Sequence, residues 1–292
     1  MADATRDPVT GQMTTGHEWN GIEEFDTPIP FVVRFFLTAT ILFAVVYWIL
    51  MPAWPLGVTY TKGLLGIDQR EIVTRQVQEA AAERAKWASR IAELPFAQIA
   101  ADPALMRHVR DTGATLFADN CSVCHGAGGK GGPGFPNLAA GSWLWGGTPE
   151  AIAQTIRVGI NGTAKDTRVS QMLGFGREGV LQREQVVSVA AYVRSLSGQT
   201  LDEADKARLP AGKEVFASTC AACHGPEGKG LLDVGAPDLT DANWIYGGDA
   251  QSVLTTIHNG RQGHMPSWEG RLSPGEIKLL ALYVGTLQGG KP

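Results

Sequence analysis

The sequence predicts a mainly helical protein in which one N-terminal transmembrane helix precedes two tandem copies of a small, loop-rich domain. Three observations lead to this prediction: a long apolar run near the N-terminus, an internal repeat over most of the remaining chain, and abundant glycine and proline. The chain has 292 residues, of which 36 are glycine and 16 are proline. Its length suits about two domains, and its composition predicts long loops between the helices.

The formal charge of the chain is −4, from 25 Lys and Arg against 29 Asp and Glu. Nucleic-acid-binding proteins need a basic surface, and a polybasic membrane-surface protein needs the same. We therefore expect no nucleic-acid partner.

The apolar run over residues 31–51 contains a single charged side chain, close to its start. As a helix it would extend roughly 30 Å, the thickness of the hydrocarbon core of a bilayer. Trp48 and Trp54 occur at its far end, where aromatic side chains favour the membrane interface. A cleaved signal peptide has a shorter apolar core behind a basic start, and a buried core helix is the other alternative. We predict a retained transmembrane helix over residues 31–54, preceded by an N-terminal segment, residues 1–30.

Residues 55–111 are predicted to link the membrane helix to the repeats. Residues 68–94 are rich in Ala, Glu, Gln and Arg, with apolar residues near helical spacing, and Pro95 ends this stretch. Two interpretations remain open: a solvated spacer helix, or a helix whose Trp87 and apolar stripe dock on a larger membrane partner.

The rest of the chain repeats, and we predict two domains, residues 112–198 and 199–292. Gly113–Phe117 corresponds to Gly212–Phe216, and a Trp-x-aromatic-Gly-Gly segment follows in both copies. Each copy begins with a short helix and continues through a Gly/Pro-rich loop. Each is predicted to close with an amphipathic helix, Gln182–Leu196 in the first copy and Pro274–Leu287 in the second.

All four cysteines of the chain fall in two C-x-x-C-H motifs, one in each copy. The motif residues are Cys121, Cys124 and His125 in the first copy, and Cys220, Cys223 and His224 in the second. Two thiols one helical turn apart can form thioethers with the two vinyl groups of a haem, and the next imidazole then reaches the iron. A thioredoxin-like dithiol would need a βαβ context, and a zinc site would need further ligands. We predict two covalently bound haem c groups, one for each motif.

A methionine is the predicted sixth iron ligand in each copy. Only Met172 and Met265 follow a haem motif, and each falls after the long loop of its own copy. A Met thioether raises the haem potential relative to a second imidazole and leaves no open position on the iron. In the second copy His264 and His258 are rival ligands, whereas no histidine follows His125 in the first.

Each copy resembles a class I cytochrome c domain, because c-type cytochromes carry this motif. That resemblance implies haem attachment outside the cytoplasmic membrane, with residues 56–292 periplasmic and residues 1–30 cytoplasmic in a bacterial inner membrane. The few Lys and Arg after the membrane helix would by themselves favour the opposite orientation.

The class I resemblance also implies packing roles around each haem. A tyrosine of the closing helix is expected to meet a glycine and a phenylalanine of the first helix in its own copy: Tyr192 with Gly113 and Phe117, and Tyr283 with Gly212 and Phe216. The carbonyl groups of Pro136 and Pro237 are expected to accept the Nδ1 proton of the haem histidines. Trp143 and Trp244 are candidate donors to the haem propionates.

The architecture as a whole resembles subunit III of cbb3-type cytochrome c oxidases, a membrane-anchored dihaem subunit. The segment Gly16-His-Glu-Trp-Asn-Gly-Ile-Glu-Glu24, followed by Pro28-Ile-Pro30, is similar to the segment before the anchor in that family. One departure is Phe31-Val-Val-Arg34, where the family often has tryptophans. The likeness covers nearly the whole chain.

This resemblance implies a non-catalytic relay of single electrons. A soluble or membrane-bound cytochrome c would donate to this chain, which would pass electrons through the monohaem cytochrome c subunit to the catalytic haem–copper oxidase subunit. Oxygen reduction and proton pumping would lie in that other chain. Entry is expected at the haem of Cys220 and Cys223, and exit through that of Cys121 and Cys124, which is nearer the anchor.

Two alternatives remain at this stage. An anchored dihaem carrier could serve another periplasmic dehydrogenase or reductase. A dihaem peroxidase would need one iron with a removable ligand, which two retained methionines argue against.

Overall fold

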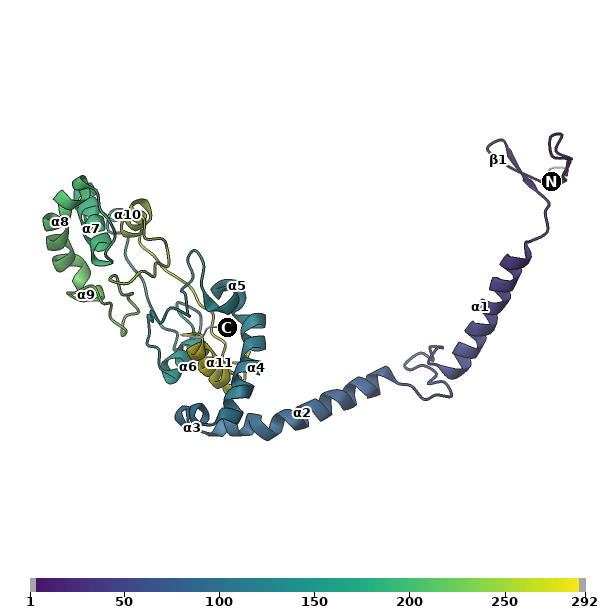
Figure 1. The fold of residues 1–292 in the computed structure, drawn as a ribbon, viewed down its shortest axis with the longest axis horizontal. Helices are drawn as coiled ribbons and strands as arrows, with labels where there is room; N and C mark the ends of the chain where they lie inside the picture. Colours follow the sequence, from purple (N-terminus) through teal and green to yellow (C-terminus); the bar gives the residue numbers. More distant parts are fainter. Residues whose placement is uncertain (1–3, 289–292) are drawn as a thin grey trace. The chain divides into compact units, whose positions relative to one another are not determined.

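The computed structural model describes residues 4–288, in which helices are joined by long loops and the named strands form a single hairpin (Figure 1). The chain divides into two compact units, one ending at Ala81 and the other beginning at Ala82.

The first unit begins with an antiparallel hairpin, β1 (Thr14–Trp19) and β2 (Ile22–Phe25). Asn20 and Gly21 form the two-residue connection, and both have positive φ angles, 53° and 86°. Positive φ at both positions is what a type I′ turn requires, and it explains the Asn-Gly pair at this point of the sequence.

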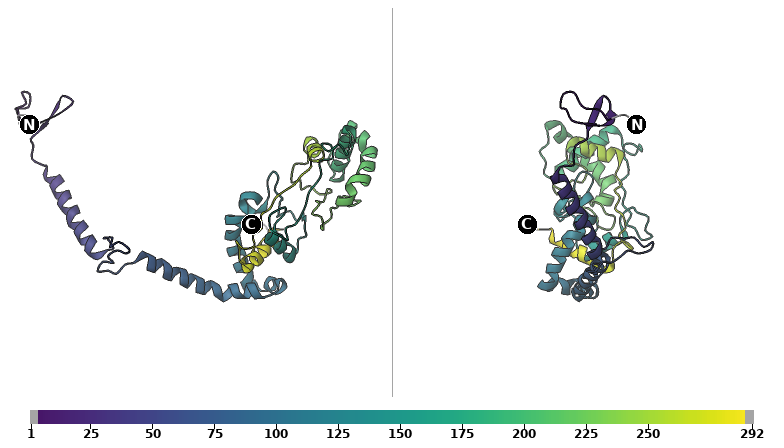
Figure 2. Two further views of the ribbon diagram at one scale, coloured as in Figure 1. Left: turned by 180° about the vertical axis from the view of Figure 1, so that it is seen from behind. Right: turned by 90° about the vertical axis from the view of Figure 1, so that its right-hand side faces the viewer.

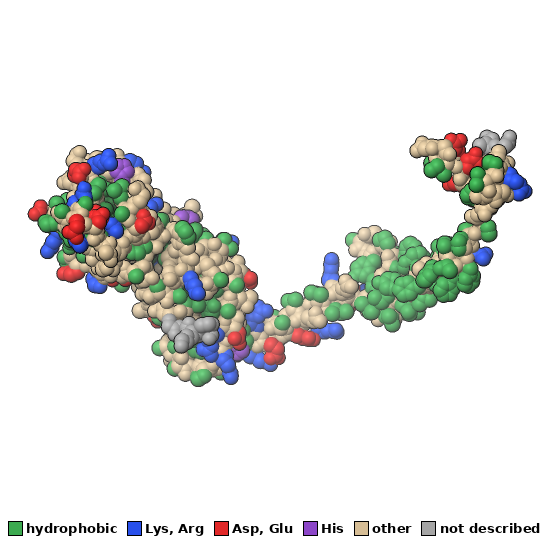
Figure 3. Space-filling view, turned by 45° about the horizontal axis from the view of Figure 1, so that its top comes forward, with side chains coloured by type: hydrophobic (Ala, Val, Ile, Leu, Met, Phe, Trp, Pro, Cys, Tyr) green, Lys and Arg blue, Asp and Glu red, His purple; other side chains and the backbone are tan. Residues whose placement is uncertain are grey.

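Helix α1 (Phe31–Leu50) has no buried side chain and presents a continuous hydrophobic surface (Figure 3). Its 20 residues are long and apolar enough to cross a membrane. The hydroxyls of Thr38 and Thr40 donate to carbonyls of the preceding turn, at 2.8 Å, so these polar groups are satisfied inside the helix. The helix ends before residue 54, because Met51 is extended and Pro52 follows.

Helix α2 (Gln69–Glu93) forms where the sequence predicts a helix, over residues 68–94, and is followed by α3 (Phe96–Ala101). Near its end, Trp87 stacks on His108, which belongs to helix α4 (Pro103–Asn120), with ring centroids 4.5 Å apart. The buried core there comprises Ile91, Ile99, Leu105, Val109, Leu279 and Leu282. Trp87 therefore packs within its own chain and needs no membrane partner, whereas Val73 and Val77 are exposed.

The remaining helices of the second unit form two groups, which we call the α4 cluster and the α8 cluster (Figures 1 and 2). The α4 cluster comprises α4 (Pro103–Asn120), α5 (Ser122–His125), α6 (Pro149–Val158) and α11 (Pro274–Thr286). The α8 cluster comprises α7 (Arg183–Leu196), α8 (Glu203–Val215), the π-helical turn η2 (Phe216–Cys220), α9 (Ala221–His224) and α10 (Ala250–Asn259). A short 3-10 turn, η1 (Ala127–Gly129), follows α5.

The two closing helices, α7 and α11, form where the sequence predicts them, but each packs against the first helix of the other copy. A Cβ on Gly113 would lie 2.6 Å from the Cβ of Tyr283, and the rings of Phe117 and Tyr283 are 5.7 Å apart. Likewise a Cβ on Gly212 would lie 2.8 Å from that of Tyr192, whose ring is 5.3 Å from that of Phe216. The predicted partners Gly113 with Tyr192 and Gly212 with Tyr283 are therefore wrong.

Loop length gives the physical reason for this exchange. Only residues 197–202 separate α7 from α8, so these helices fold back on each other as an antiparallel helical hairpin. Once α7 occupies the groove of α8, the matching groove of α4 is left for α11. The exchange is reciprocal because the contact residues are the same types in both copies.

Two short backbone pairings lie where the chain passes between the clusters. Ile160 pairs with Met265, and Met172 pairs with Arg261, each in antiparallel geometry. After α6, the chain thus leaves the α4 cluster and enters the α8 cluster, and after α10 it makes the opposite passage.

Candidate haem sites

The first C-x-x-C-H motif lies at the end of α4 and over the single turn of α5. Cys121 is the C-cap of α4, and the backbone N–H of His125 donates to its carbonyl at 2.9 Å. Cys121 is half-buried and Cys124 is exposed, one helical turn away. Gly126, with φ of 74°, ends the helix and sends the chain into the Gly/Pro-rich loop.

The second motif has the same local structure. Cys220 ends the π-helical turn, and Cys223 and His224 belong to α9. Gly225, with φ of 75°, ends that helix as Gly126 ends the first. Both pairs of thiols are therefore spaced as thioether formation with one haem requires.

Each motif histidine is oriented by a proline carbonyl, as predicted. The Nδ1 of His125 lies 3.2 Å from the carbonyl oxygen of Pro136, and that of His224 lies 3.1 Å from that of Pro237. A proton on Nδ1 donates to that carbonyl and leaves Nε2 free for a metal. Burial lowers the pKa of both imidazoles, which favours the neutral form that a metal binds.

Burial disfavours the thiolate form of the two half-buried cysteines. Burial raises the pKa of Cys121 and of Cys220 to about 11, and the neighbouring cysteine of each motif acts in the same direction. Both thiols are therefore protonated at neutral pH.

The methionines occupy the two clusters in exchanged order. Met265 packs against the buried core that contains Phe117, as Cys121 does, whereas Met172 packs against the core that contains Phe216, as Cys220 does. Each methionine thus shares a hydrophobic core with the haem motif of the other copy. The expectation that each methionine serves its own copy is not supported by this packing.

The rival histidines are exposed and lie in neither core. His264 directs Nδ1 to the carbonyl oxygen of Asn161 at 3.0 Å. His258 is packed against the backbone of Gly176, where an added Cβ would meet its ring. Both histidines therefore contact residues of the first copy, His264 at Asn161 and His258 at Gly176.

Asn161 joins the two chain segments that pass between the clusters, a role that the sequence did not predict. Its Nδ2 donates to the carbonyls of Ser170 and Gly263, each at 2.7 Å, and its Oδ1 accepts from the N–H of Ser170 at 3.0 Å. It also has a positive φ of 50°. The signal was slight, since an asparagine before a glycine commonly marks a turn.

A second missed feature is an arginine four residues before each methionine. The guanidinium of Arg168 lies 4.8 Å from the ring centroid of Trp145, and that of Arg261 lies 4.3 Å from that of Tyr246. These aromatics belong to the repeated Trp-x-aromatic-Gly-Gly segments. The twin Arg-x-x-x-Met spacing was the signal that could have revealed them.

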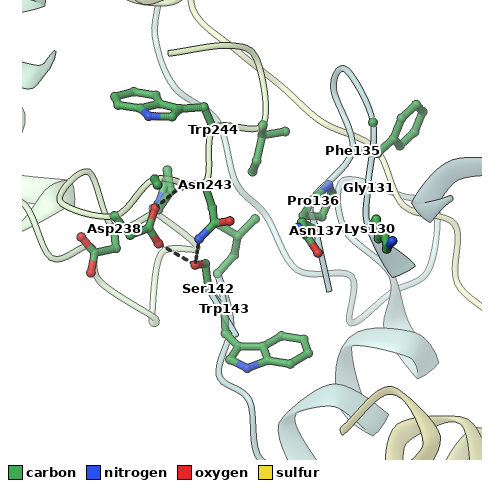
Figure 4. Close-up of a pocket in the computed structure, with 16 residues that line it drawn as sticks. Lys130, Gly131, Phe135, Pro136, Asn137, Ser142, Trp143, Asp238, Asn243 and Trp244 are labelled. Atoms are coloured by element: carbon green, nitrogen blue, oxygen red, sulfur yellow. Dashed lines mark hydrogen bonds between the residues drawn. The ribbon is translucent and has the colours of Figure 1, made fainter. Parts of the chain in front are cut away.

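A pocket of about 310 Å³ lies between the loops that follow the two motifs (Figure 4). Its wall includes both orienting prolines, Pro136 and Pro237, and both tryptophans, Trp143 and Trp244. The two prolines hold the two motif histidines, so this pocket separates the candidate haem sites.

The residues present fit covalent haem better than a bare metal ion. Among residues 4–288, no group of three or more His, Cys, Asp or Glu side chains could hold such an ion. Each cluster instead offers paired thiols, an oriented imidazole and a thioether, of which one thiol and the thioether pack against its apolar core. That set supplies both attachment points and both axial ligands of a haem c.

Comparison with known protein families gives three consecutive matches. Residues 11–58 match the N-terminal domain of cytochrome oxidase-cbb3, FixP. Residues 111–197 match cytochrome c, and residues 207–284 match cytochrome c oxidase, cbb3-type, subunit III.

Similar proteins cover essentially the whole chain. The cbb3-type cytochrome c oxidase subunit FixP of Bradyrhizobium diazoefficiens is 46% identical over 288 residues, 98% of each chain. The subunit CcoP of Azospirillum brasilense is 43% identical over the full length of both chains, and that of Cereibacter sphaeroides is 44% identical over 95% of each.

Proposed function

Because the chain belongs to the family of cbb3-type cytochrome c oxidase subunit III, we propose that it carries two covalent haem c groups and relays electrons through both. The family is that of a membrane-anchored cytochrome c within the oxidase complex, and α1 is the candidate anchor. The observation that carries the haem count is the duplicated site, with its own thiols, imidazole and thioether in each cluster.

We assign the ligands across the repeats. Cys121 and Cys124 would hold the haem whose axial ligands are His125 and Met265. Shared core packing supports this pairing, because a ligand must reach the same iron as the histidine opposite it.

The second haem would be held by Cys220 and Cys223, with His224 and Met172 as its axial ligands. When bound, each haem supplies a one-electron Fe(III)/Fe(II) couple. The protein orients each imidazole through a proline carbonyl, and the methionine of the same cluster would supply the second axial ligand. A six-coordinate iron passes electrons without binding substrate, which fits a relay and disfavours a peroxidase.

Substitution of each methionine tests the assignment. We expect Met265→Ala to abolish the Met–iron charge-transfer band of the haem on Cys121 and Cys124 while the other haem keeps its band. Met172→Ala should do the reverse. The two haems are distinguished by pairing each variant with Cys124→Ala or Cys223→Ala, which weakens attachment of one haem at a time. The assignment across the repeats would be contradicted if each methionine substitution abolished the band of the haem bound by the motif of that methionine's own copy.

For the direction of flow, we infer entry at the haem of the α8 cluster and exit at that of the α4 cluster. The supporting observation is that the end of α2, the helix that comes from the membrane anchor, packs on α4 through Ile91 and Trp87. In a stopped-flow experiment with reduced donor cytochrome c, the His224 haem should be reduced first. Reduction of the His125 haem first would contradict this direction.

The partners we propose are the catalytic haem–copper subunit and the monohaem cytochrome c subunit, with a cytochrome c as donor. Residues 1–30 would be cytoplasmic and the haem clusters periplasmic, since haem c attachment is an extracytoplasmic process. Detergent extraction should recover the chain together with a haem–copper subunit. Recovery with another dehydrogenase or reductase instead would favour the alternative carrier role.

A further inference from the structure

The pocket between the two candidate haem sites contains a hydrogen-bonded bridge that joins the two copies (Figure 4). Ser142 donates its hydroxyl to the Oδ2 of Asp241 at 2.5 Å, and the Nδ2 of Asn243 donates to the oxygen of Ser142 at 2.9 Å. The other carboxylate oxygen of Asp241 accepts from the backbone N–H of Asn243 at 2.7 Å. We call these three residues the inter-copy bridge.

Ser142 and Asn243 are equivalent positions of the repeat, because each directly precedes the first tryptophan of its Trp-x-aromatic-Gly-Gly segment. The bridge therefore joins the two copies at the point where their equivalent residues meet. Asp241 breaks the equivalence: the corresponding residue of the first copy is Ala140, since both are four residues after the orienting proline. The carboxylate of Asp241 thus accepts hydrogen bonds from both copies, from Ser142 of the first and Asn243 of the second.

Each end of the bridge is tied to one candidate haem site. Trp143, next to Ser142, packs in the α4 cluster together with Cys121. Trp244, next to Asn243, packs in the α8 cluster together with Cys220. The bridge therefore has one end next to each candidate haem site.

The charge of Asp241 is not neutralised by an ion pair. Within residues 4–288 its carboxylate forms none, whereas Asp238, in the same pocket wall, lies 3.8 Å from the ammonium of Lys229. Asp238 accepts hydrogen bonds from Thr240 and, within residues 4–288, makes none to the first copy. Asp238 is therefore a matched control for Asp241: it lies in the same pocket wall, but it is paired with Lys229, whereas Asp241 is bonded to Ser142 of the other copy.

We propose that the inter-copy bridge is the electrostatic link between the two haems, and that Asp241 lowers the reduction potential of both. A negative charge near an iron stabilises Fe(III), which carries one more positive charge than Fe(II). Because the carboxylate is shared, both potentials move together when it is removed. The proposal rests on the proposed dihaem function.

The test is a redox titration of the full chain, purified in detergent, for Asp241→Asn, Asp238→Asn and Ser142→Ala. We expect Asp241→Asn to raise both potentials, each by at least a threefold change in the one-electron equilibrium constant, about 28 mV at 59 mV per tenfold. Asp238→Asn should shift them less than half as much, because Lys229 compensates that charge. Ser142→Ala breaks the bridge but keeps the carboxylate, so it too should shift them less than half as much.

Haem content and the two Met–iron bands, measured on the same samples, separate this inference from the proposed function. A wild-type chain with fewer than two haems would overturn the dihaem assignment itself. If all variants keep two Met-ligated haems and Asp241→Asn moves neither potential, or only one, the link is disproved. Equal shifts in Asp241→Asn and Ser142→Ala would show a role in packing alone, and would also overturn it.

Discussion

At the scale of single residues, two glycines set how closely the exchanged helices approach. A Cβ on Gly212 would overlap the carbonyl group of Ser188, which is backbone and cannot rotate away. At Gly113 the nearest atoms belong to the side chain of Tyr283. The first helix of each copy therefore needs glycine at this position for a steric reason.

We expect Gly212→Ala to destabilise the chain by about 2–3 kcal/mol, the usual cost of overpacking. For a domain of this size that corresponds to a melting temperature lower by roughly 4–12 °C, measured by circular dichroism. Gly285→Ala is the matched control, because Gly285 is also helical and a Cβ there meets nothing within 4 Å. That control should be neutral or slightly stabilising; an equal loss in both variants would refute the steric explanation.

At the scale of elements, Asn161 fixes the crossing segments to each other. It makes side-chain bonds both to its own segment, at Ser170, and to the segment before Met265, at Gly263. Its positive φ adds a conformational preference that alanine does not share. This one residue therefore couples the two loops that carry the methionines.

We expect Asn161→Ala to cost about 2–4 kcal/mol, from lost hydrogen bonds and left-handed strain. Because both loops depend on it, the Met–iron bands of both haems should weaken at the same denaturant concentration. Asn161→Gly removes the strain alone and should recover part of the loss. Asn20→Ala, at the left-handed turn of the N-terminal hairpin, is the control that should leave both bands unchanged. Weakening of only one band in Asn161→Ala would contradict the coupling.

The elements were predictable from sequence, whereas their pairing was not. Cys121 and Cys220 identify the haem motifs through spacing alone, and prolines and caps mark the helix ends, so these local signals suffice. The pairing depends on Gly113, Tyr192 and Tyr283, and both copies supply the same residue types. Sequence similarity between the copies makes either pairing acceptable, and only the short connection between α7 and α8 decides between them.

At the scale of the whole molecule, α7 and α11 each pack in the cluster of the other copy. The α4 cluster and the α8 cluster are therefore expected to stay together when the chain is cut between the copies. Helix α11 contributes Ile277, Leu280 and Val284 to buried core of the α4 cluster. In return, α7 contributes Val186, Val189 and Val193 to that of the α8 cluster. Each of these side chains stabilises its cluster by about 1.5–3 kcal/mol when fully buried. The apolar contacts of α7 and α11 together stabilise the pair of clusters more than the contact between two domains that are joined only by a linker.

A protease site inserted at Gly198 tests this architecture. Gly198 lies in the connection between α7 and α8, and a Cβ there meets nothing within 4 Å, so an insertion is tolerated. After cleavage of the full chain in detergent, both fragments should co-elute under native conditions with both haems, and separate only in denaturant. The matched cut at Gly57, in the first unit and equally unobstructed, should instead free the haem-bearing fragment from the membrane fraction. If the cut at Gly198 releases the C-terminal fragment with its haem, each copy folds by itself, and both the exchange and the crossed ligand assignment fail together.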